Sequence, residues 1–173
     1  MKIEIRIAGV GGQGLVSASV VLAEALGVVR DFKVVQTQFY ASHITGGASS
    51  GDVIVSDEKI VFPWVLAPDV LIALAQDAVD AHAAKMRPGT KVIVDDIMAS
   101  DISAFCDGVD VHWAPLTRLA DEAGFRKCAN IVALGAFSRL TGFLNLDQIS
   151  QAVLTSAPGK PDVNRKAVEA GYA

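Results

Sequence analysis

The sequence predicts an α/β fold in which a mostly parallel sheet lies between two layers of helices. Short runs of β-branched and apolar residues alternate along the chain with longer segments of helical composition. A cluster of glycines directly follows the first strand and opens the first helix. Half of the 173 residues are apolar and a fifth are charged, which is typical of a folded chain. We expect one domain spanning residues 1–173.

The first part of the chain reads as a strand, a glycine turn and a helix. Isoleucine alternates with charged residues over 3–7, which is the period of a strand. Glycines then interrupt the chain within 9–14, and Leu15–Val28 has the composition of a helix. Lys33–Gln38 is the second expected strand, and Tyr40–Gly51 is a polar, glycine-rich loop.

A β-hairpin is expected after this loop. Asp52–Ser56 and Lys59–Phe62 are short runs of strand composition on either side of a polar turn. Pro63 and Pro68 enclose a connection that cannot be the middle of a helix. The hairpin would make the sheet mixed, a Rossmann-like variant with antiparallel strands added to parallel ones.

The second part of the chain alternates buried strands with helices. The runs Val70–Leu74 and Lys91–Val94 are almost wholly apolar, as in strands covered on both faces. A last strand is expected at Val109–Ala114. The expected helices are Gln76–Met86, Leu116–Ala123, Asn130–Leu140, Asp147–Leu154 and Asn164–Ala170.

Charge and cysteine content exclude several classes of function. The net charge is −4 and the isoelectric point is about 5.3, so nothing attracts the chain to nucleic acid or to an anionic membrane. Cys106 and Cys128 are the only cysteines, and they cannot build a zinc site or an iron–sulfur cluster alone. The N-terminus alternates charged residues with isoleucine, whereas a signal peptide needs a continuous apolar stretch after its basic start. The longest apolar runs are far shorter than a membrane span. We expect a cytoplasmic protein.

The glycine turn is the first candidate site. Gly9, Gly11, Gly12, Gln13 and Gly14 match the pattern GxGxxG between a strand and a helix. Glycines allow phosphate to approach main-chain N–H groups, and the helix N-terminus adds favourable partial charge. The alternative is that the glycines only let the strand and helix pack closely. An NAD site would also need an acid at the end of the second strand, where Gln36 and Gln38 stand instead.

A second small-residue loop follows the second strand. Thr45, Gly46, Gly47 and Ser49 lie in a stretch that could form a nest of free N–H donors for an anion. Its alternative role is a simple turn. Because both loops follow strands of a parallel sheet, both are expected at the carboxyl edge, where ligands of such folds bind. No nucleophile elbow, zinc helix or GK[ST] loop occurs, so no self-contained catalytic site is predicted.

Five stretches in order resemble the gamma subunit, or gamma domain, of the 2-oxoacid:ferredoxin oxidoreductases of the pyruvate, 2-oxoglutarate and 2-ketoisovalerate type. They are 9–14, with its Gly-Gly-Gln-Gly core, 46–60, 68–74, 130–142 and 164–172. One departure is Thr45, which stands where the family usually has arginine before Gly46-Gly47. An arginine there could hold an anion through two hydrogen bonds, and threonine cannot.

The resemblance implies a subunit of an enzyme rather than an autonomous enzyme. The family converts a 2-oxoacid and coenzyme A to acyl-CoA and carbon dioxide, and passes electrons to ferredoxin. The resemblance implies that thiamine diphosphate and iron–sulfur clusters lie on partner subunits, named alpha, beta and in some complexes delta. For this chain it implies contact with coenzyme A phosphates through the two glycine loops, and a role in assembly. A homodimer is the alternative state for the isolated chain.

Two other functions stay open from the sequence. The chain could be a purely structural subunit, whose glycines serve packing and assembly. It could also be a free-standing, Rossmann-like nucleotide-binding protein, although the acid that would hold a ribose is missing.

Overall fold

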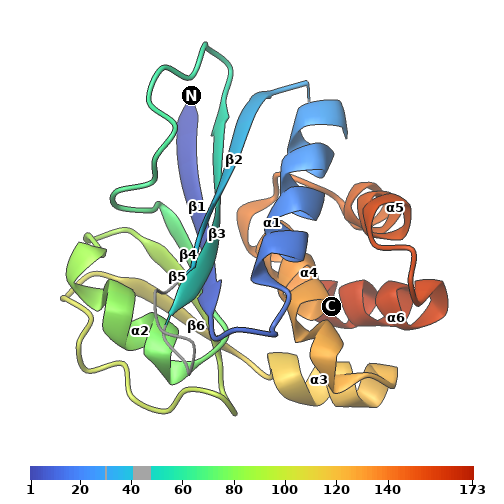
Figure 1. Ribbon diagram of the computed structural model, residues 1–173. Helices are drawn as coiled ribbons and strands as arrows, with labels where there is room; N and C mark the ends of the chain where they lie inside the picture. Colours follow the sequence, from blue (N-terminus) through green and yellow to red (C-terminus); the bar gives the residue numbers. More distant parts are fainter. Residues whose placement is uncertain (30, 41–47) are drawn as a thin grey trace.

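The computed structural model describes residues 1–29, 31–40 and 48–173. They form one six-stranded sheet in the order β2-β3-β1-β4-β5-β6, flanked by helices (Figure 1). The strands are β1 (Lys2–Gly9), β2 (Lys33–Phe39), β3 (Ser49–Ser56), β4 (Val70–Ala73), β5 (Lys91–Asp95) and β6 (Asp110–Ala114).

The helices lie between and after these strands. The α-helices are α1 (Leu15–Glu24), α2 (Gln76–His82), α3 (Leu116–Ala123), α4 (Ala129–Thr141), α5 (Leu146–Ser156) and α6 (Pro161–Tyr172). Three short helical turns extend or precede them: a π-helical turn at Ala25–Val29 and 3₁₀ turns at Ala83–Lys85 and Arg126–Cys128. The α/β fold and the order of the elements after residue 69 confirm the sequence prediction.

One antiparallel strand is inserted into an otherwise parallel sheet. β3 runs antiparallel to β1 on one side and to β2 on the other, with Asp52 opposite both Arg6 and Thr37. β1, β4, β5 and β6 are mutually parallel. Because β3 is antiparallel to both of its neighbours, β2 runs in the same direction as β1. Both β1 and β2 therefore end at the same edge of the sheet.

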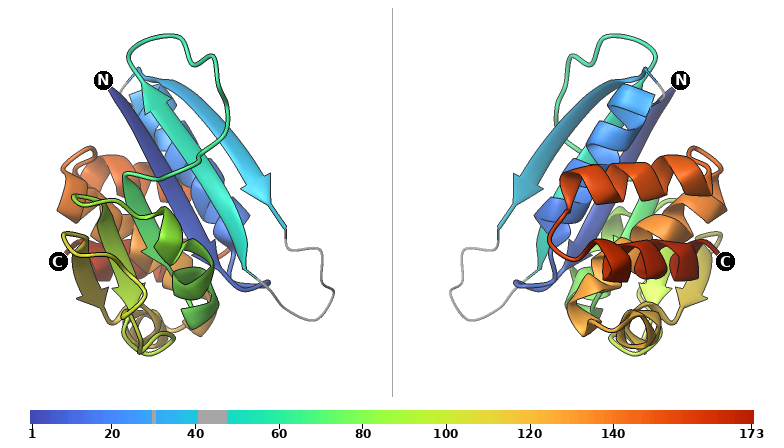
Figure 2. Two further views of the ribbon diagram at one scale, coloured as in Figure 1. Left: turned by 90° about the vertical axis from the view of Figure 1, so that its left-hand side faces the viewer. Right: turned by 90° about the vertical axis from the view of Figure 1, so that its right-hand side faces the viewer.

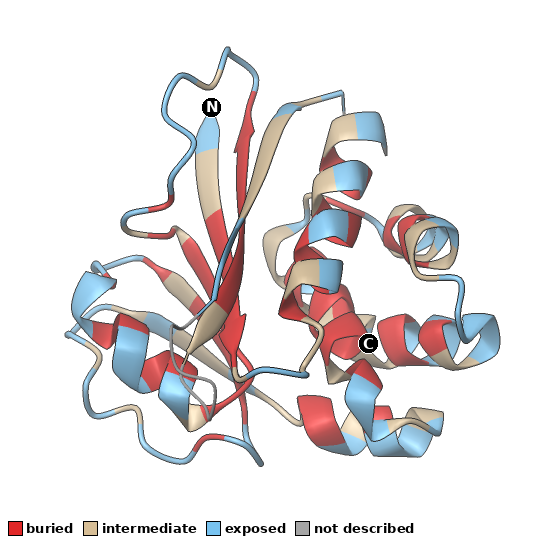
Figure 3. Cartoon of the chain, in the orientation of Figure 1, coloured by how far each residue is buried: buried red, intermediate tan, exposed pale blue. Residues whose placement is uncertain are grey.

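The two faces of the sheet are covered unequally. The larger apolar cluster joins alternate residues of β1, β3 and β4, such as Ile5, Val53 and Ile72, to α1, α4, α5 and α6. A smaller cluster packs α2 against β4 and β5 on the opposite face. Figure 2 shows the helices on each face of the sheet from two sides. Figure 3 shows buried residues on the strands and on the helix surfaces that face them.

The predicted hairpin is wrong. Asp52–Ser56 is part of β3, but Lys59–Phe62 contains no strand. Both edges of β3 are already paired with β1 and β2, so no edge is left for a hairpin partner. The antiparallel partners of β3 are β1 and β2, and Ser49, Ser50 and Gly51, expected in the loop, belong to β3.

Helix ends differ from the expected ones where glycine was taken as a stop. The terminal helix was expected to end at Ala170, yet α6 continues through Gly171 to Tyr172. The first helix was expected to continue to Val28, and it changes to a π-helical turn at Ala25. Among the described residues, no helix has the length and hydropathy needed to cross a membrane.

Candidate functional site

The glycine turn leaves β1 at the carboxyl edge of the sheet and leads directly into α1. Gly12 and Gly14 have φ angles of 87° and 70°, a left-handed conformation that side chains with Cβ rarely adopt. Gly11 and Gly12 are exposed. The turn therefore presents main chain to solvent at the edge where ligands of parallel sheets bind.

Gln13 holds the turn in shape. Its Oε1 accepts a hydrogen bond from the N–H of Val10 at 2.8 Å, and its Nε2 donates to the carbonyl oxygen of Leu74 at 2.8 Å. Both ends of the amide are thus engaged by main chain, one within the turn and one just after β4. Gln13, predicted as a ligand contact, ties the glycine turn to the neighbouring strand.

The glycines of the turn differ in what they are needed for. A Cβ atom on Gly9 would collide with Oε1 of Gln13, and one on Gly14 would lie 2.5 Å from Nδ2 of Asn130. These two positions have a packing reason to be glycine. Gly11 has none, because a Cβ atom there would meet no atom within 4 Å and its φ is not positive. Its exposed main chain is free for an incoming group.

Hydrogen-bond donors gather where the turn meets α1. In the described part of the chain, the N–H groups of Gly11, Gly12 and Gly14 have no hydrogen-bond partner. Gly14 caps α1 without a side-chain hydrogen bond, so the first N–H groups of the helix also remain open. Such an array of donors with a helix N-terminus favours a phosphate or a carboxylate.

Asn130 joins this turn to the start of α4. Its Nδ2 donates to the carbonyl oxygen of Gly14 at 3.0 Å, although 116 residues separate the two. Asn130 also lines a pocket of about 360 Å³, together with Ser17 of α1 and the segment before α6. Asn130 thus lies in the first turn of α4, at a junction between two helices.

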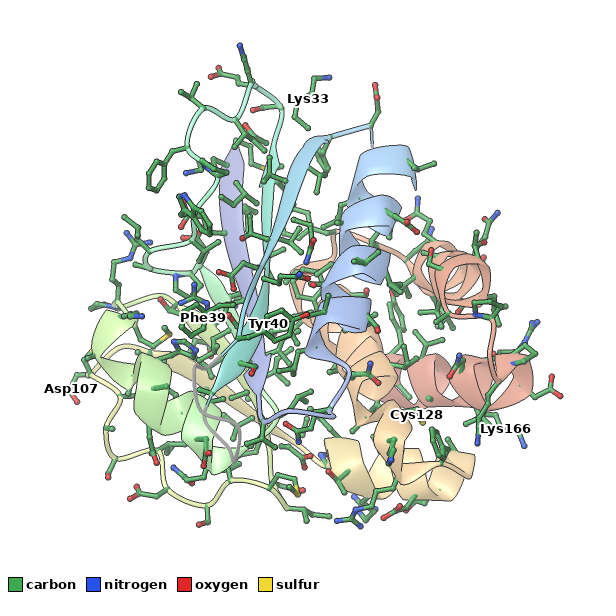
Figure 4. All side chains as sticks on the ribbon, viewed as in Figure 1. Lys33, Phe39, Tyr40, Asp107, Cys128 and Lys166 are labelled. Carbon is green, nitrogen blue, oxygen red and sulfur yellow. The ribbon has the colours of Figure 1, made fainter. Side chains whose placement is uncertain are left out.

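Two lysines border this pocket. Lys127 precedes α4, and Lys160 precedes α6, with its Nζ 3.6 Å from the centre of the Phe125 ring. Cys128 also lines the pocket and lies where α3, α4 and α6 meet (Figure 4). Burial raises the pKa of the Cys128 thiol, so it is an inert, protonated group. The pocket therefore offers positive charge beside the open donors of the glycine turn.

Only part of the second predicted loop lies within the described residues. Thr45, Gly46 and Gly47 lie outside the described residues, as does His43. Ser49 is the first residue of β3 and pairs with Gly9. The structure thus brings Ser49 to the same edge as the glycine turn, as expected from the parallel arrangement.

Asp95, the last residue of β5, holds the turn after this strand and the start of α3. It is fully buried, and its carboxylate accepts hydrogen bonds from the N–H of Ile97 and from the N–H and hydroxyl of Thr117 at the start of α3. Within the described ranges, no three side chains of the histidine, cysteine or acidic type lie together as a metal site.

A second polar cluster lies on the α2 face, and no sequence pattern indicates it. Arg6 and Asp52 form a buried, bidentate ion pair with distances of 2.8 and 2.5 Å. His82 of α2 lines a cavity beside this pair, and its two buried ring nitrogens have no hydrogen-bond partner among the described residues. The alternation of charge in β1 and the antiparallel register of β3 could have paired Arg6 with Asp52, had the partner strand been known.

Comparison with known proteins decides which family has this arrangement. The model of the family described as pyruvate ferredoxin/flavodoxin oxidoreductase matches residues 4–173. The chain belongs to this family. It is 39% identical to the 2-oxoglutarate synthase subunit KorC of Methanocaldococcus jannaschii over 175 residues, which is 99% of this chain and 93% of the relative.

Two solved structures of this family share the fold. The gamma subunit of a keto/oxoacid ferredoxin oxidoreductase from Geobacter sulfurreducens is 34% identical, with a TM-score of 0.86 over 99% of this chain and 95% of that one. The 2-oxoglutarate:ferredoxin oxidoreductase from Magnetococcus marinus, with 2-oxoglutarate, coenzyme A and succinyl-CoA bound, is 26% identical, with a TM-score of 0.82. The match covers 98% of this chain but 30% of that longer one. The predicted relation to oxidoreductase gamma subunits is thereby confirmed.

Proposed function

We propose that this chain is the gamma subunit of a complex that oxidises a 2-oxoacid with coenzyme A to acyl-CoA and carbon dioxide. Full-length similarity to a 2-oxoglutarate synthase subunit supports this role and makes 2-oxoglutarate the first substrate to test. The family includes members named for pyruvate and ketoisovalerate as well. The chain is expected to be inactive alone, and to act with alpha, beta and, where present, delta subunits.

The part of this reaction that the chain carries is contact with coenzyme A. The observation that supports it is the combination of open N–H donors at Gly11 and Gly12 with a lysine-bordered pocket next to them. Phosphates of coenzyme A would accept hydrogen bonds from the turn and from the start of α1. Lys127 and Lys160 would supply charge that remains attractive to phosphate without fixing one geometry.

The electron chemistry belongs elsewhere in the complex. Thiamine diphosphate would supply the carbanion chemistry, and iron–sulfur clusters would carry electrons to ferredoxin. We assign both to the partner subunits. For this chain we propose no covalent or proton-transfer role, and its described residues bind, orient and support the neighbouring subunits.

The test is kinetics of the complex purified after co-expression of all subunits. Gly11→Ala adds a methyl group where the isolated chain has open space, so folding should be unaffected while an approaching phosphate is obstructed. We expect KM for coenzyme A to rise about ten-fold with little change in KM for 2-oxoglutarate. Lys127→Gln and Lys160→Gln should act in the same direction, and less strongly.

Gly27→Ala is the matched control. It lies in the turn that follows α1, and its Cβ would make only an ordinary 3.5 Å contact with Val34. An unchanged KM for coenzyme A in Gly11→Ala would favour the purely structural subunit. In that alternative the turn serves only internal contacts, namely the close packing at Gly9 and Gly14 and the two hydrogen bonds of Gln13. Purification of the chain without partner subunits or oxidoreductase activity would remove the subunit role altogether.

A further inference from the structure

A small cavity on the α2 face is distinct from the glycine turn. It has a volume of about 150 Å³ and lies between the ends of β2 and β3, the connection after β3, and α2. Arg6, Asp52, His82 and Lys85 line it, and Phe39 and Trp64 stand at its rim. The volume is several times what one water molecule needs, so a small organic group fits.

Hydrogen-bond donors in this cavity outnumber acceptors. Nε and Nη2 of Arg6 are engaged by Asp52, and Nη2 also donates to the carbonyl oxygen of Val65. Among the described residues, Nη1 of Arg6 and Nζ of Lys85 have no partner. Arg6 is only 6% exposed, so its open donors face a site largely shielded from water.

His82 is the second group whose polar atoms are open. It is 7% exposed, and neither ring nitrogen makes a hydrogen bond to a residue that the structure describes. A buried polar group left unpaired costs stability. Rotation of the ring about its last side-chain bond exchanges nitrogen and carbon positions, so a ring N–H can be turned towards an occupant of the cavity without displacing the helix.

The charges around the cavity select a monoanion. Arg6 and Lys85 carry two positive charges, and Asp52 carries one negative charge, while β2 and residues 64–65 contribute no charged group to the lining. The lining therefore has one net positive charge, which a ligand with a single negative charge neutralises. A phosphate dianion would leave one net negative charge beside Asp52. The aromatic rim favours a ligand with a short apolar body next to its charge.

We propose that this cavity binds a carboxylate group, which accepts hydrogen bonds from Arg6, Lys85 and His82. The carboxylate is either that of a free small acid or that of a side chain from a partner subunit. Both present the same charge and the same oxygen geometry to the donors. The site lies on the opposite face of the sheet from α1, so its occupancy is independent of the coenzyme A contact proposed above.

The first experiment titrates the full-length chain with sodium acetate, at ionic strength held constant with sodium chloride. Imidazole signals of His82 are followed by NMR, and the fluorescence of Trp64 is followed in a Trp113→Phe background, where it is the only tryptophan. We expect saturable changes of both signals. Lys85→Gln should weaken acetate binding about five-fold through loss of one charge-assisted contact.

Lys166→Gln on α6 is the control, since it removes the same charge from an exposed position on the other side of the molecule (Figure 4). Its acetate affinity should equal that of the unaltered chain. Absence of saturation, an equal response to chloride, or equal affinities of the Lys85 and Lys166 variants would overturn the proposal. These variants avoid the Arg6–Asp52 pair, whose removal would threaten folding.

The second experiment identifies the source of the carboxylate. Hydrogen exchange at the His82 ring is measured by mass spectrometry in the co-expressed complex, with and without acetate. The site belongs to a partner's carboxylate if, in the complex without acetate, the pKa of His82 is higher than in the isolated chain and acetate no longer changes it. A response that persists in the complex assigns it to a free acid. An exchange rate in the complex that equals that of the acetate-free chain and ignores acetate would overturn both.

Discussion

Gly171 of α6 lies directly against Val132 of α4. A Cβ atom at position 171 would clash with the carbonyl oxygen of Val132 and lie 2.8 Å from its carbonyl carbon. The contact is reciprocated one turn away, where a Cβ on Gly135 of α4 would clash with the carbonyl oxygen of Val168. The backbones of α4 and α6 therefore touch, and the two glycines make this approach possible.

Gly171→Ala should accordingly destabilise the chain although alanine is the better helix former. The methyl group meets main-chain atoms that cannot move aside, so α6 must shift as a whole. We expect a loss of roughly 2–4 kcal/mol in the free energy of unfolding, measured by urea denaturation.

Gly159→Ala is the control for this helix contact, because no atom lies within 4 Å of its added Cβ. It should change stability by less than about 0.5 kcal/mol. Equal stability of the Gly171 variant and the unaltered chain would show that α4 and α6 can separate freely, contrary to the packing described here.

These glycines also show where sequence patterns stop being informative. Residues 130–140 and 164–170 have helical composition, and the predicted helices are confirmed. A glycine near a helix end has the same sequence signature whether it terminates the helix or lets it touch a neighbour. Gly142 does terminate α4 with a φ of 68°, whereas Gly171 continues α6. Only the position of the other helix distinguishes them.

Gln13→Ala should loosen the glycine turn. It removes the acceptor of the Val10 N–H and the donor to the Leu74 carbonyl. Loss of two hydrogen bonds in a partly buried turn is expected to cost about 1–3 kcal/mol in unfolding free energy. Gln13→Glu tests the Leu74 hydrogen bond more specifically. It keeps the shape of the side chain and the acceptor for Val10, but it places a carboxylate oxygen against the Leu74 carbonyl oxygen.

The exposed Gln151→Ala on α5 provides the comparison in urea denaturation and should be close to neutral. If Gln13→Glu were as stable as the unaltered chain, the amide nitrogen would not hold the turn to the end of β4.

The buried ion pair should be sensitive to the loss of either partner. Asp52→Ala leaves the Arg6 guanidinium buried, and the Val65 carbonyl is then its only acceptor in the described part of the chain. We expect a loss of about 3–5 kcal/mol, because one uncompensated charge remains in a site shielded from water. Urea denaturation of the variant and of the unaltered chain measures this difference in unfolding free energy.

The double replacement of Arg6→Met with Asp52→Leu tests the same explanation. Two apolar side chains need no partner, so much of the lost stability should return. A double variant less stable than Asp52→Ala would indicate that packing around Arg6, rather than its charge, dominates this region.

The candidate site was foreseen in part for a physical reason. A glycine cluster between a strand and a helix constrains the local backbone, and local constraints are visible in sequence. The cluster of Arg6, Asp52 and His82 joins residues from β1, β3 and α2. Its formation depends on β3 being inserted antiparallel between β1 and β2. The predicted hairpin placed that strand differently, so this proximity could not be inferred.

His82 should make stability depend on pH. Burial, followed by the positive charges of Arg6 and Lys85, lowers the pKa of His82 to about 4 from its ordinary value of 6.5. The unfolded chain thus binds a proton at this residue more readily than the folded chain does. The associated stability is present above pH 6.5 and is lost as the pH falls through about 4. The loss amounts to about 3 kcal/mol.

His82→Leu removes this proton linkage while filling a similar space. The difference in unfolding free energy between the unaltered chain and the variant should therefore change across that pH interval, in favour of the variant at acid pH. Carboxylates that titrate nearby affect both proteins equally and cancel in the difference. Gln151→Ala, at an exposed residue of α5 that carries no ionisable group, should leave the pH profile unaltered. A constant difference between the unaltered chain and His82→Leu would mean that His82 becomes protonated as readily folded as unfolded, and that water reaches its ring.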